Sequence, residues 1–122
     1  MIKVNKIEWL SKEANEAEVY LSDDNFNIIC FAHPFDKNIG DLITQPLYTL
    51  NTKEVDKLSD EDKIFMVESN GDNFEYRLTG QVINKENNYI RIGDFTISLD
   101  ISLPNDIEEG DFISCTCDRV DL

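Results

Sequence analysis

Residues 89–98 have the sequence Tyr89-Ile90-Arg91-Ile92-Gly93-Asp94-Phe95-Thr96-Ile97-Ser98. Apolar side chains occupy every second position on both sides of Gly93-Asp94, which is the pattern of β-strands with one buried face. A Gly-Asp pair between two such runs is typical of a two-residue turn, because glycine accepts a positive φ and aspartate bonds to nearby backbone groups. The stretch therefore predicts a β-hairpin that turns at Gly93-Asp94.

The same Gly-Asp pair occurs at three other places in the 122-residue chain. It precedes an apolar run at Gly40-Asp41 and at Gly110-Asp111, and it occurs again at Gly71-Asp72. These pairs predict further turns, most of which begin a strand. The expected strands, taken from the alternation and the turn residues between them, are 2–9, 18–21, 27–31, 47–50, 63–68, 78–85, 89–92, 95–100 and 112–118.

Short strands joined by glycine-containing turns predict an all-β, or mainly β, fold in a single domain that spans residues 1–122. The expected architecture is a small antiparallel barrel or sandwich, and the pattern of the C-terminal half resembles OB-like or SH3-like barrels. We expect at most one or two short helices, because only residues 52–62 have a spacing compatible with a helical turn. The residues expected to share one core are Ile90, Ile92, Phe95, Ile97, Leu99, Ile113 and Cys115.

The chain is strongly acidic. It has 25 acidic residues against 11 basic ones, which gives a net charge of -14, whereas a small soluble domain typically carries about 2–8 charges of either sign. Such a charge accelerates encounter with a basic partner, although solubility alone is the alternative explanation. Direct binding of nucleic acid is not expected, because it needs clusters of Lys and Arg and no two basic residues are adjacent here.

Cys30, His33, Cys115 and Cys117 are the residues considered for metal or nucleophilic chemistry. On a strand, Cys115 and Cys117 would place their sulfur atoms about 7 Å apart, too far for a good tetrahedral zinc site with Cys30 and His33. A catalytic cysteine takes its histidine from elsewhere in the fold, and the chain has no histidine besides His33. We therefore expect three reduced, buried thiols, no metal or cofactor, and no enzymatic activity.

Carboxylates are dense in several expected loops. Residues 106–111 partly match the spacing of a calcium loop but lack its downstream Glu, so we expect no calcium site there. Aromatic residues such as Phe35, Tyr48, Tyr76 and Tyr89 could anchor a partner within an acidic rim, or could pack in the core instead. The predicted partner-binding residues are Asp23, Asp24, Asp60, Glu61, Asp62, Glu108 and Glu109.

The N-terminal residues show no apolar leader after Met1, and no stretch approaches the roughly 20 apolar residues of a membrane span. We therefore expect a cytoplasmic protein that does not bind membranes and whose cysteines stay reduced.

Set on a scaffold rich in Phe and Ile, the segments Asp23-Asp24, Asp60-Glu61-Asp62 and Glu108-Glu109 resemble those of immunity proteins from bacterial toxin–immunity systems, including contact-dependent growth inhibition systems. Such proteins bind and neutralise a cognate toxin, often a basic nuclease. The resemblance implies a non-catalytic binding protein that neutralises a basic, nuclease-type toxin domain. Two alternatives stay open: an accessory or structural subunit of a larger bacterial assembly, and a small enzyme or small-ligand binder.

Overall fold

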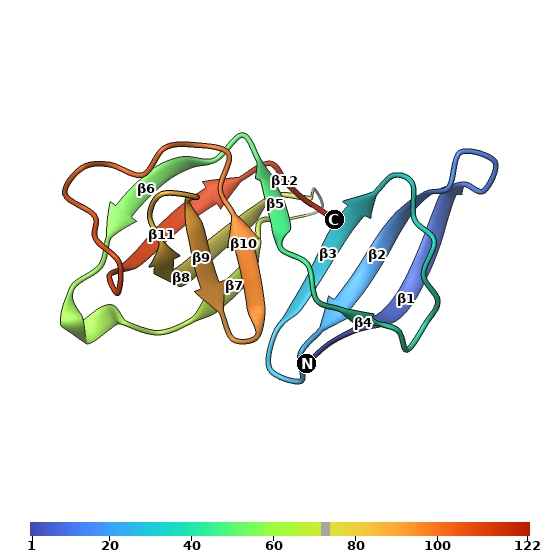
Figure 1. The fold of residues 1–122 in the computed structure, drawn as a ribbon, viewed down its shortest axis with the longest axis horizontal. Coiled ribbons are helices and arrows are strands. Elements are labelled where there is room, and N and C mark those ends of the chain that lie inside the picture. Colours follow the sequence, from blue (N-terminus) through green and yellow to red (C-terminus); the bar gives the residue numbers. More distant parts are fainter. Residues whose placement is uncertain (72–73) are drawn as a thin grey trace.

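The computed structural model describes residues 1–71 and 74–122 and is built from strands (Figure 1). These residues contain twelve strands, one 3₁₀ turn and no α-helix, so the all-β prediction is confirmed. Nor do they contain a helix long and apolar enough to cross a membrane. The elements are β1 (Ile2–Ser11), β2 (Glu16–Ser22), β3 (Asn27–Ala32), β4 (Leu42–Ile43), β5 (Leu47–Leu50), β6 (Lys53–Lys57), η1 (Asp60–Asp62), β7 (Met66–Ser69), β8 (Tyr76–Asn84), β9 (Tyr89–Ile92), β10 (Phe95–Ser98), β11 (Phe112–Cys117) and β12 (Arg119–Asp121).

The strands form one open sheet in the order β4-β1-β2-β3-β12-β5-β10-β9-β8-β11-β6, and β7 pairs with β8 off this path. Most neighbours are antiparallel, but β5–β10 and β3–β12 are parallel pairs, so the sheet is mixed. Figure 1 shows β1–β4 at one end of the molecule, β6–β11 curled together at the other, and the C-terminus between them.

The predicted antiparallel barrel of OB-like or SH3-like form is wrong, because the sheet is mixed and does not close into a barrel. Strand β12, which follows β11, joins β5 to β3. The Asp118 N–H donates to the Leu50 carbonyl at 2.9 Å, and the Leu122 N–H donates to the Phe31 carbonyl at 2.9 Å. These contacts extend the sheet into β1–β4, and side-chain alternation within a strand carries no information about them.

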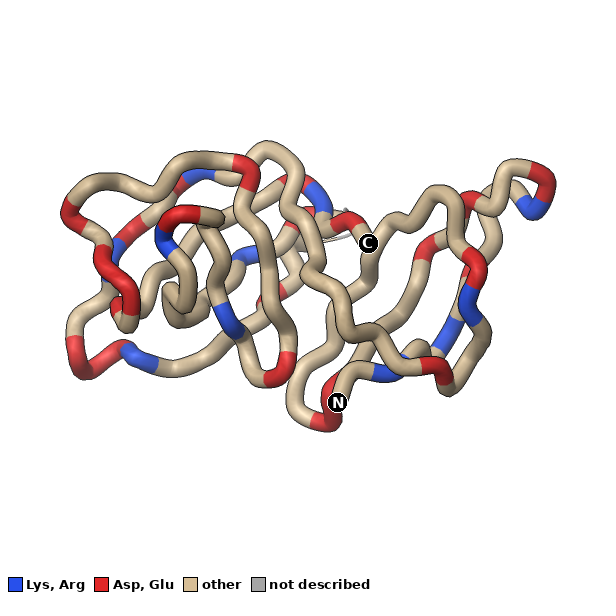
Figure 2. The backbone as a smooth tube through the Cα atoms, viewed as in Figure 1, with Lys and Arg blue, Asp and Glu red and all other residues tan. Residues whose placement is uncertain are grey.

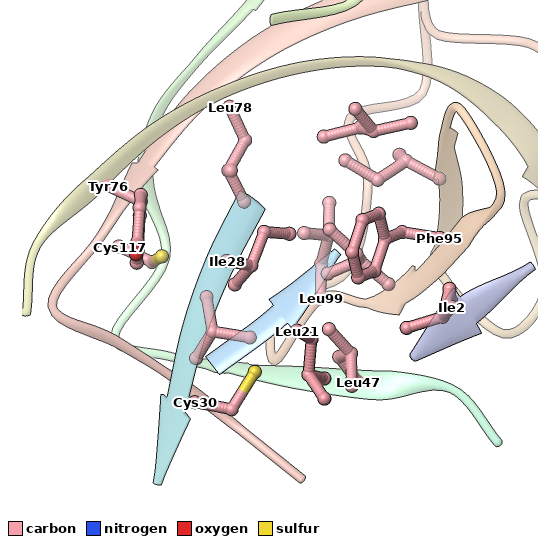
Figure 3. Packing of buried hydrophobic residues seen from close by; sticks show 14 of the residues in the cluster. Ile2, Leu21, Ile28, Cys30, Leu47, Tyr76, Leu78, Phe95, Leu99 and Cys117 are labelled. Atoms are coloured by element: carbon pink, nitrogen blue, oxygen red, sulfur yellow. The ribbon is translucent and has the colours of Figure 1, made fainter. Parts of the chain in front are cut away.

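The core lies on the faces of the strands that alternation marks as apolar. In β2, Val19 and Leu21 are buried between half-exposed neighbours, and β3 repeats this pattern. Leu21 and Ile28 from β2 and β3 lie among Leu47 of β5, Phe95 of β10 and Leu99, which follows β10 (Figure 3). The seven residues predicted to share a core are all buried in one cluster, so this prediction is confirmed.

Several local predictions are also confirmed. The β9–β10 hairpin pairs Ile92 with Phe95 and turns at Gly93, whose φ is 56°. The strands expected at 18–21 and 27–31 form the β2–β3 hairpin, and those expected at 78–85 and 89–92 form the β8–β9 hairpin. The remaining Gly-Asp pair is Gly71-Asp72, and its Asp72 lies outside the described residues.

Residues 52–62 contain the expected short 3₁₀ turn, η1, but also a strand that was not expected. In β6 the half-buried residue is Val55, while the other four are exposed. A strand at the edge of a sheet with so little burial shows no alternation, so its pairing with β11 could not be predicted from its own residues.

Strand β8 changes partners at Gly80, which is buried. Residues 76–79 pair with β7, and residues from Gln81 onward pair with β9, while β11 runs along the other edge. A Cβ atom at Gly80 would lie 2.7 Å from the Arg91 carbonyl oxygen and 2.9 Å from Ile92 Cγ1. Only glycine allows this close approach of β8 to β9.

Candidate protein-binding surface

Two acidic segments far apart in the sequence meet at one end of the molecule. Strands β6 and β11 are antiparallel neighbours, so the segment after β6 and the segment before β11 leave the sheet at the same end. The Leu58 N–H donates to the Phe112 carbonyl at 2.8 Å, and Lys57 Nζ lies 3.3 Å from Asp111 Oδ2. Figure 2 shows several Asp and Glu positions (red) close together at this end, and further red segments around β1–β4 at the other end. We call the end at which the two segments meet the acidic end; its residues are Asp56, Asp60, Glu61, Asp62, Asp106, Glu108, Glu109 and Asp111.

The segment before β11 is held by a tight turn from Glu108 to Asp111. The Asp111 N–H donates to the Glu108 carbonyl at 3.1 Å, and the Glu108 N–H donates to Asp111 Oδ2 at 2.8 Å. Gly110 supplies the required φ of 95°. The Glu108 N–H, aided by Lys57 and Lys63, lowers the pKa of Asp111, so this carboxylate builds the turn while Glu108 and Glu109 remain exposed.

The segment after β6 is shaped by η1. The Asp62 N–H donates to the Ser59 carbonyl at 3.0 Å, and Ser59 Oγ donates to Asp62 Oδ2 at 3.0 Å. Lys63 Nζ lies 2.7 Å from Asp60 Oδ1, and this hydrogen bond lowers the pKa of Asp60. All three acidic residues of η1 are exposed, so their charges face solvent.

Three lysines lie within this end and offset part of its charge. Besides Lys57 and Lys63, Lys85 Nζ donates to the Asn105 carbonyl at 3.2 Å and lies 4.0 Å from Glu108 Oε1. Exposed pairs of this kind are screened by solvent and contribute little to stability. Carboxylates outnumber these lysines, so the end keeps a negative field toward solvent.

A shallow apolar hollow of about 320 Å³ adjoins η1. Ile64 is 68% exposed at its mouth, whereas Phe65 is half-buried and packs on Phe112 with ring centroids 5.4 Å apart. The guanidinium of Arg91, on β9, lies 4.9 Å from the centre of the Phe65 ring. The residues that line the hollow are Leu58, Asp62, Ile64, Phe65, Met66, Arg77, Thr79 and Ser114.

Asp23 and Asp24 do not join the acidic end, because the β2–β3 turn that carries them lies near the N-terminus (Figure 1). Asp23 is 4% exposed and accepts hydrogen bonds from the N–H groups of Asn25 at 3.0 Å, Phe26 at 2.8 Å and Asp94 at 2.8 Å. Burial opposes ionisation of Asp23, but these three donors outweigh it and lower its pKa. Its carboxylate is used by the fold, whereas Asp24 is exposed.

The thiols of Cys30, Cys115 and Cys117 are free and buried. Burial raises the pKa of Cys115 to about 12 and that of Cys117 to about 11, and it also raises that of Cys30. Thiols held in the protonated form are poor nucleophiles. Among residues 1–71 and 74–122, no group of three or more His, Cys, Asp or Glu side chains is arranged to hold a metal ion.

A larger hollow of about 520 Å³ lies between the β2–β3 hairpin and β7. It is lined by Phe26, Ile29 and Val67 together with asparagine and tyrosine side chains. Its charged lining residue, Lys6, pairs with Glu8 at 2.8 Å. The hollow therefore combines apolar and amide surface and offers no paired acid and base.

Of the predicted partner-binding residues, the structure brings Asp60, Glu61, Asp62, Glu108 and Glu109 together and separates Asp23 and Asp24 from them. Sequence analysis missed the hollow beside them. One sequence signal was available: after Lys63, which follows the acidic stretch of η1, the four consecutive apolar residues 64–67 do not alternate as a strand over 63–68 would. Of the four aromatic residues considered as anchors, Phe35 and Tyr76 are buried, Tyr89 is half-buried and Tyr48 is 50% exposed.

No protein-family model, no curated protein and no solved structure matches this chain.

Proposed function

We propose that this chain is a non-catalytic binding protein that captures a basic protein partner through its acidic end. The partner that fits best is a basic, nuclease-type toxin domain, which the chain neutralises as an immunity protein in the cytoplasm. The observation that carries the proposal is the convergence of η1 and the Glu108–Asp111 turn, which the fold brings to one end from two distant parts of the sequence.

The distribution of charge supports steering over solubility. A negative charge that serves solubility can be spread evenly, because only its total matters. At the acidic end, eight carboxylates from two converging segments stand against Lys57, Lys63 and Lys85, whereas the carboxylates around β1–β4 lie on β1, on β2 and on separate loops. A concentrated field orients an approaching basic surface and raises its association rate.

The way in which the carboxylates are used also supports binding. Glu61, Glu108 and Glu109 are exposed, and the hydrogen bonds that build the two turns are made by Asp62 and Asp111. Apart from Glu109, which also accepts a hydrogen bond from the Lys85 N–H at 3.2 Å, the side chains that shape the surface are therefore distinct from those that project from it. A bound basic partner would replace solvent around the projecting carboxylates by charge-assisted hydrogen bonds.

The proposal is tested by recovering the partner from the native cell, identifying it, and measuring its association rate with the purified chain. Between about 0.05 and 0.5 M salt the Debye length falls from more than about 10 Å to less than about 5 Å. We expect the association rate to fall by tenfold or more over this range. A rate that does not change would contradict steering and would favour the accessory-subunit alternative.

A matched pair of variants tests whether the charges that raise the association rate lie at the acidic end. Glu61→Gln/Glu108→Gln removes two charges from the acidic end, and Glu13→Gln/Asp36→Asn removes two exposed charges near β1. We expect the first variant to associate several-fold more slowly at low salt and the second to associate at nearly the native rate. Equal slowing by both variants would show that net charge matters and that its position does not.

A further inference from the structure

We propose that the apolar hollow beside η1 binds one side chain of the partner and so anchors it at the acidic end; we call this hollow the socket. It takes one aliphatic or aromatic side chain from a partner segment in which the neighbouring residues are Lys or Arg. This inference rests on the proposed function and adds to it the point at which the captured partner is held.

The walls of the socket are apolar and partly exposed. Ile64 is 68% exposed, and Phe65 and Met66 are half-buried beside it, so a guest side chain would cover apolar surface that now contacts water. Burial of one large apolar side chain contributes about 1.5–3 kcal/mol. The volume of about 320 Å³ is near the lower limit of ligand pockets, which suits one side chain better than a cofactor.

The socket is preformed. Phe65 is clamped between Phe112, at a centroid distance of 5.4 Å, and Phe26, at 6.4 Å, and Arg91 stacks on the same ring. The floor is made by Thr79 and Ser114, which face each other across β8 and β11 and are both buried. A rigid site loses little side-chain freedom when it is occupied, which favours affinity.

Charge complementarity decides which kind of segment enters. Asp62 lines the socket itself, Asp60 and Glu61 precede it on η1, and the Glu108–Asp111 turn is tied to the same place by the bond between Leu58 and Phe112. A segment that carries Lys or Arg beside its apolar residue would place these cations against the carboxylates. An acidic or purely apolar segment would gain no such contacts.

Arg77 determines the orientation in which a basic segment can bind to the socket. It lines the hollow from β8, whereas Asp62 lines it from η1, and Arg77 lies across from Glu68 in the β7–β8 pair. A cation of the guest is repelled on this side and attracted on the η1 side. The basic flank of the guest therefore runs toward η1 and the Glu108–Asp111 turn.

The two parts of the surface should act on different rate constants. Exposed charges change mainly the association rate and its dependence on salt, whereas a buried anchor changes mainly the dissociation rate. Loss of the socket should therefore shorten the lifetime of a complex without changing how fast it forms.

The experiment uses two synthetic peptides of equal charge, each with four lysines on one side of a residue that is Leu in one peptide and Ser in the other. Each is titrated into the ¹⁵N-labelled full chain at 0.05 M salt. We expect the Leu peptide to bind about tenfold more tightly and to shift the amide signals of Ile64, Met66 and Ser114. The ratio of the affinities of the Leu and Ser peptides should fall to about 1 in Ile64→Ser. It should stay at about ten in Leu10→Ser, a control at a residue on β1 that is 54% exposed.

The possible results separate this inference from the proposed function. Equal, salt-sensitive binding of both peptides would reject the socket and leave capture by the acidic end standing. A preference for Leu that is insensitive to salt would support the socket and count against steering. Binding of neither peptide would count against both, and an unchanged thermal midpoint of Ile64→Ser would exclude unfolding as the cause of any loss.

Discussion

The β2–β3 turn and the acidic end both carry adjacent carboxylates, but they use them in opposite ways. In the turn, Asp23 is buried and receives three backbone N–H groups, one of them from Asp94 in the β9–β10 hairpin, and Asp24 projects into solvent. At the acidic end most carboxylates are exposed. Three of them pair with lysines, and Asp62, Glu109 and Asp111 each accept a hydrogen bond, from Ser59 Oγ, the Lys85 N–H and the Glu108 N–H. A carboxylate that receives several buried donors belongs to the fold, and one that faces solvent is available to a partner.

Asp100 extends the comparison to a third turn. It accepts hydrogen bonds from the N–H groups of Asn51 at 2.7 Å and Thr52 at 2.9 Å, and so holds the turn between β5 and β6. These donors outweigh the effect of burial and lower the pKa of Asp100. Part of the acidity of the chain therefore serves turns, so fewer carboxylates are available to contact a partner directly than the sequence contains.

The largest effect is expected from removing the buried carboxylate. Asp23→Asn keeps the size of the side chain but loses the charge and turns an amide group toward backbone donors, leaving buried N–H groups unsatisfied. We expect the free energy of unfolding to fall by about 2–4 kcal/mol, measured by urea denaturation. Asp24→Asn is the matched control, with an expected change below about 0.5 kcal/mol. Equal losses of unfolding free energy in Asp23→Asn and Asp24→Asn would show that the two carboxylates do not differ in their importance for the fold.

The two Gly-Asp pairs allow the same comparison through the backbone. Gly93 has φ 56° and lies against the Asp23 carboxylate and the Phe26 ring, whereas Gly110 has φ 95° and open space, with no neighbour within 4 Å, where a Cβ would stand. Both Ala variants carry the strain of a positive φ, about 1–2 kcal/mol, but Gly93→Ala must also displace Asp23. We expect Gly93→Ala to destabilise the chain by at least about 1 kcal/mol more than Gly110→Ala, measured by urea denaturation. Equal destabilisation would mean that the turn around Asp23 can shift at little cost.

Much of the strand pattern could be predicted from the sequence, because each buried strand face repeats every two residues and each tight turn has its own residue chemistry. Phe95, Ile97 and Ile113 show this most clearly. The parallel pairing of β12 with β3 could not be predicted, since it depends on where the chain travels after β11. Strand β6 was missed because an exposed edge strand needs no apolar face.

The candidate surface was predictable in composition but not in arrangement. Asp23 and Asp24 are identical in type and adjacent, and only the positions of the Asn25, Phe26 and Asp94 N–H groups distinguish them. The meeting of η1 with the Glu108–Asp111 turn depends on the pairing of β6 with β11, which had no local signal. For the same reason, the apolar hollow beside η1 became evident only once the fold was known.

The dependence of stability on pH should also distinguish the two regions. The pKa of Asp23 is lowered in the folded state, so its stabilisation is fully present above the pKa of an unfolded aspartate, about 3.9, and is lost as the pH falls through the folded value. We expect stability to decline below about pH 4, and Asp23→Asn to reduce the slope of this decline. Unfolding free energies measured from about pH 6 to about pH 2.5 test this, and parallel curves for the native chain and Asp23→Asn would contradict it.

The smallest effect on stability is expected at the acidic end, where the largest effect on binding is expected. In Glu61→Gln/Glu108→Gln no backbone donor loses its partner, because the turns are bonded through Asp62 and Asp111. Removing two like charges from a chain of net charge -14 relieves repulsion, so the free energy of unfolding should stay within about 0.5 kcal/mol of the native value or rise slightly. Any rise should be larger at about 0.02 M than at about 0.5 M salt, because salt screens the same repulsion. Thermal unfolding at the two salt concentrations measures this. A clear loss of stability at both would show that these carboxylates support the fold, as Asp23 does, and would weaken the case that they are held out for a partner.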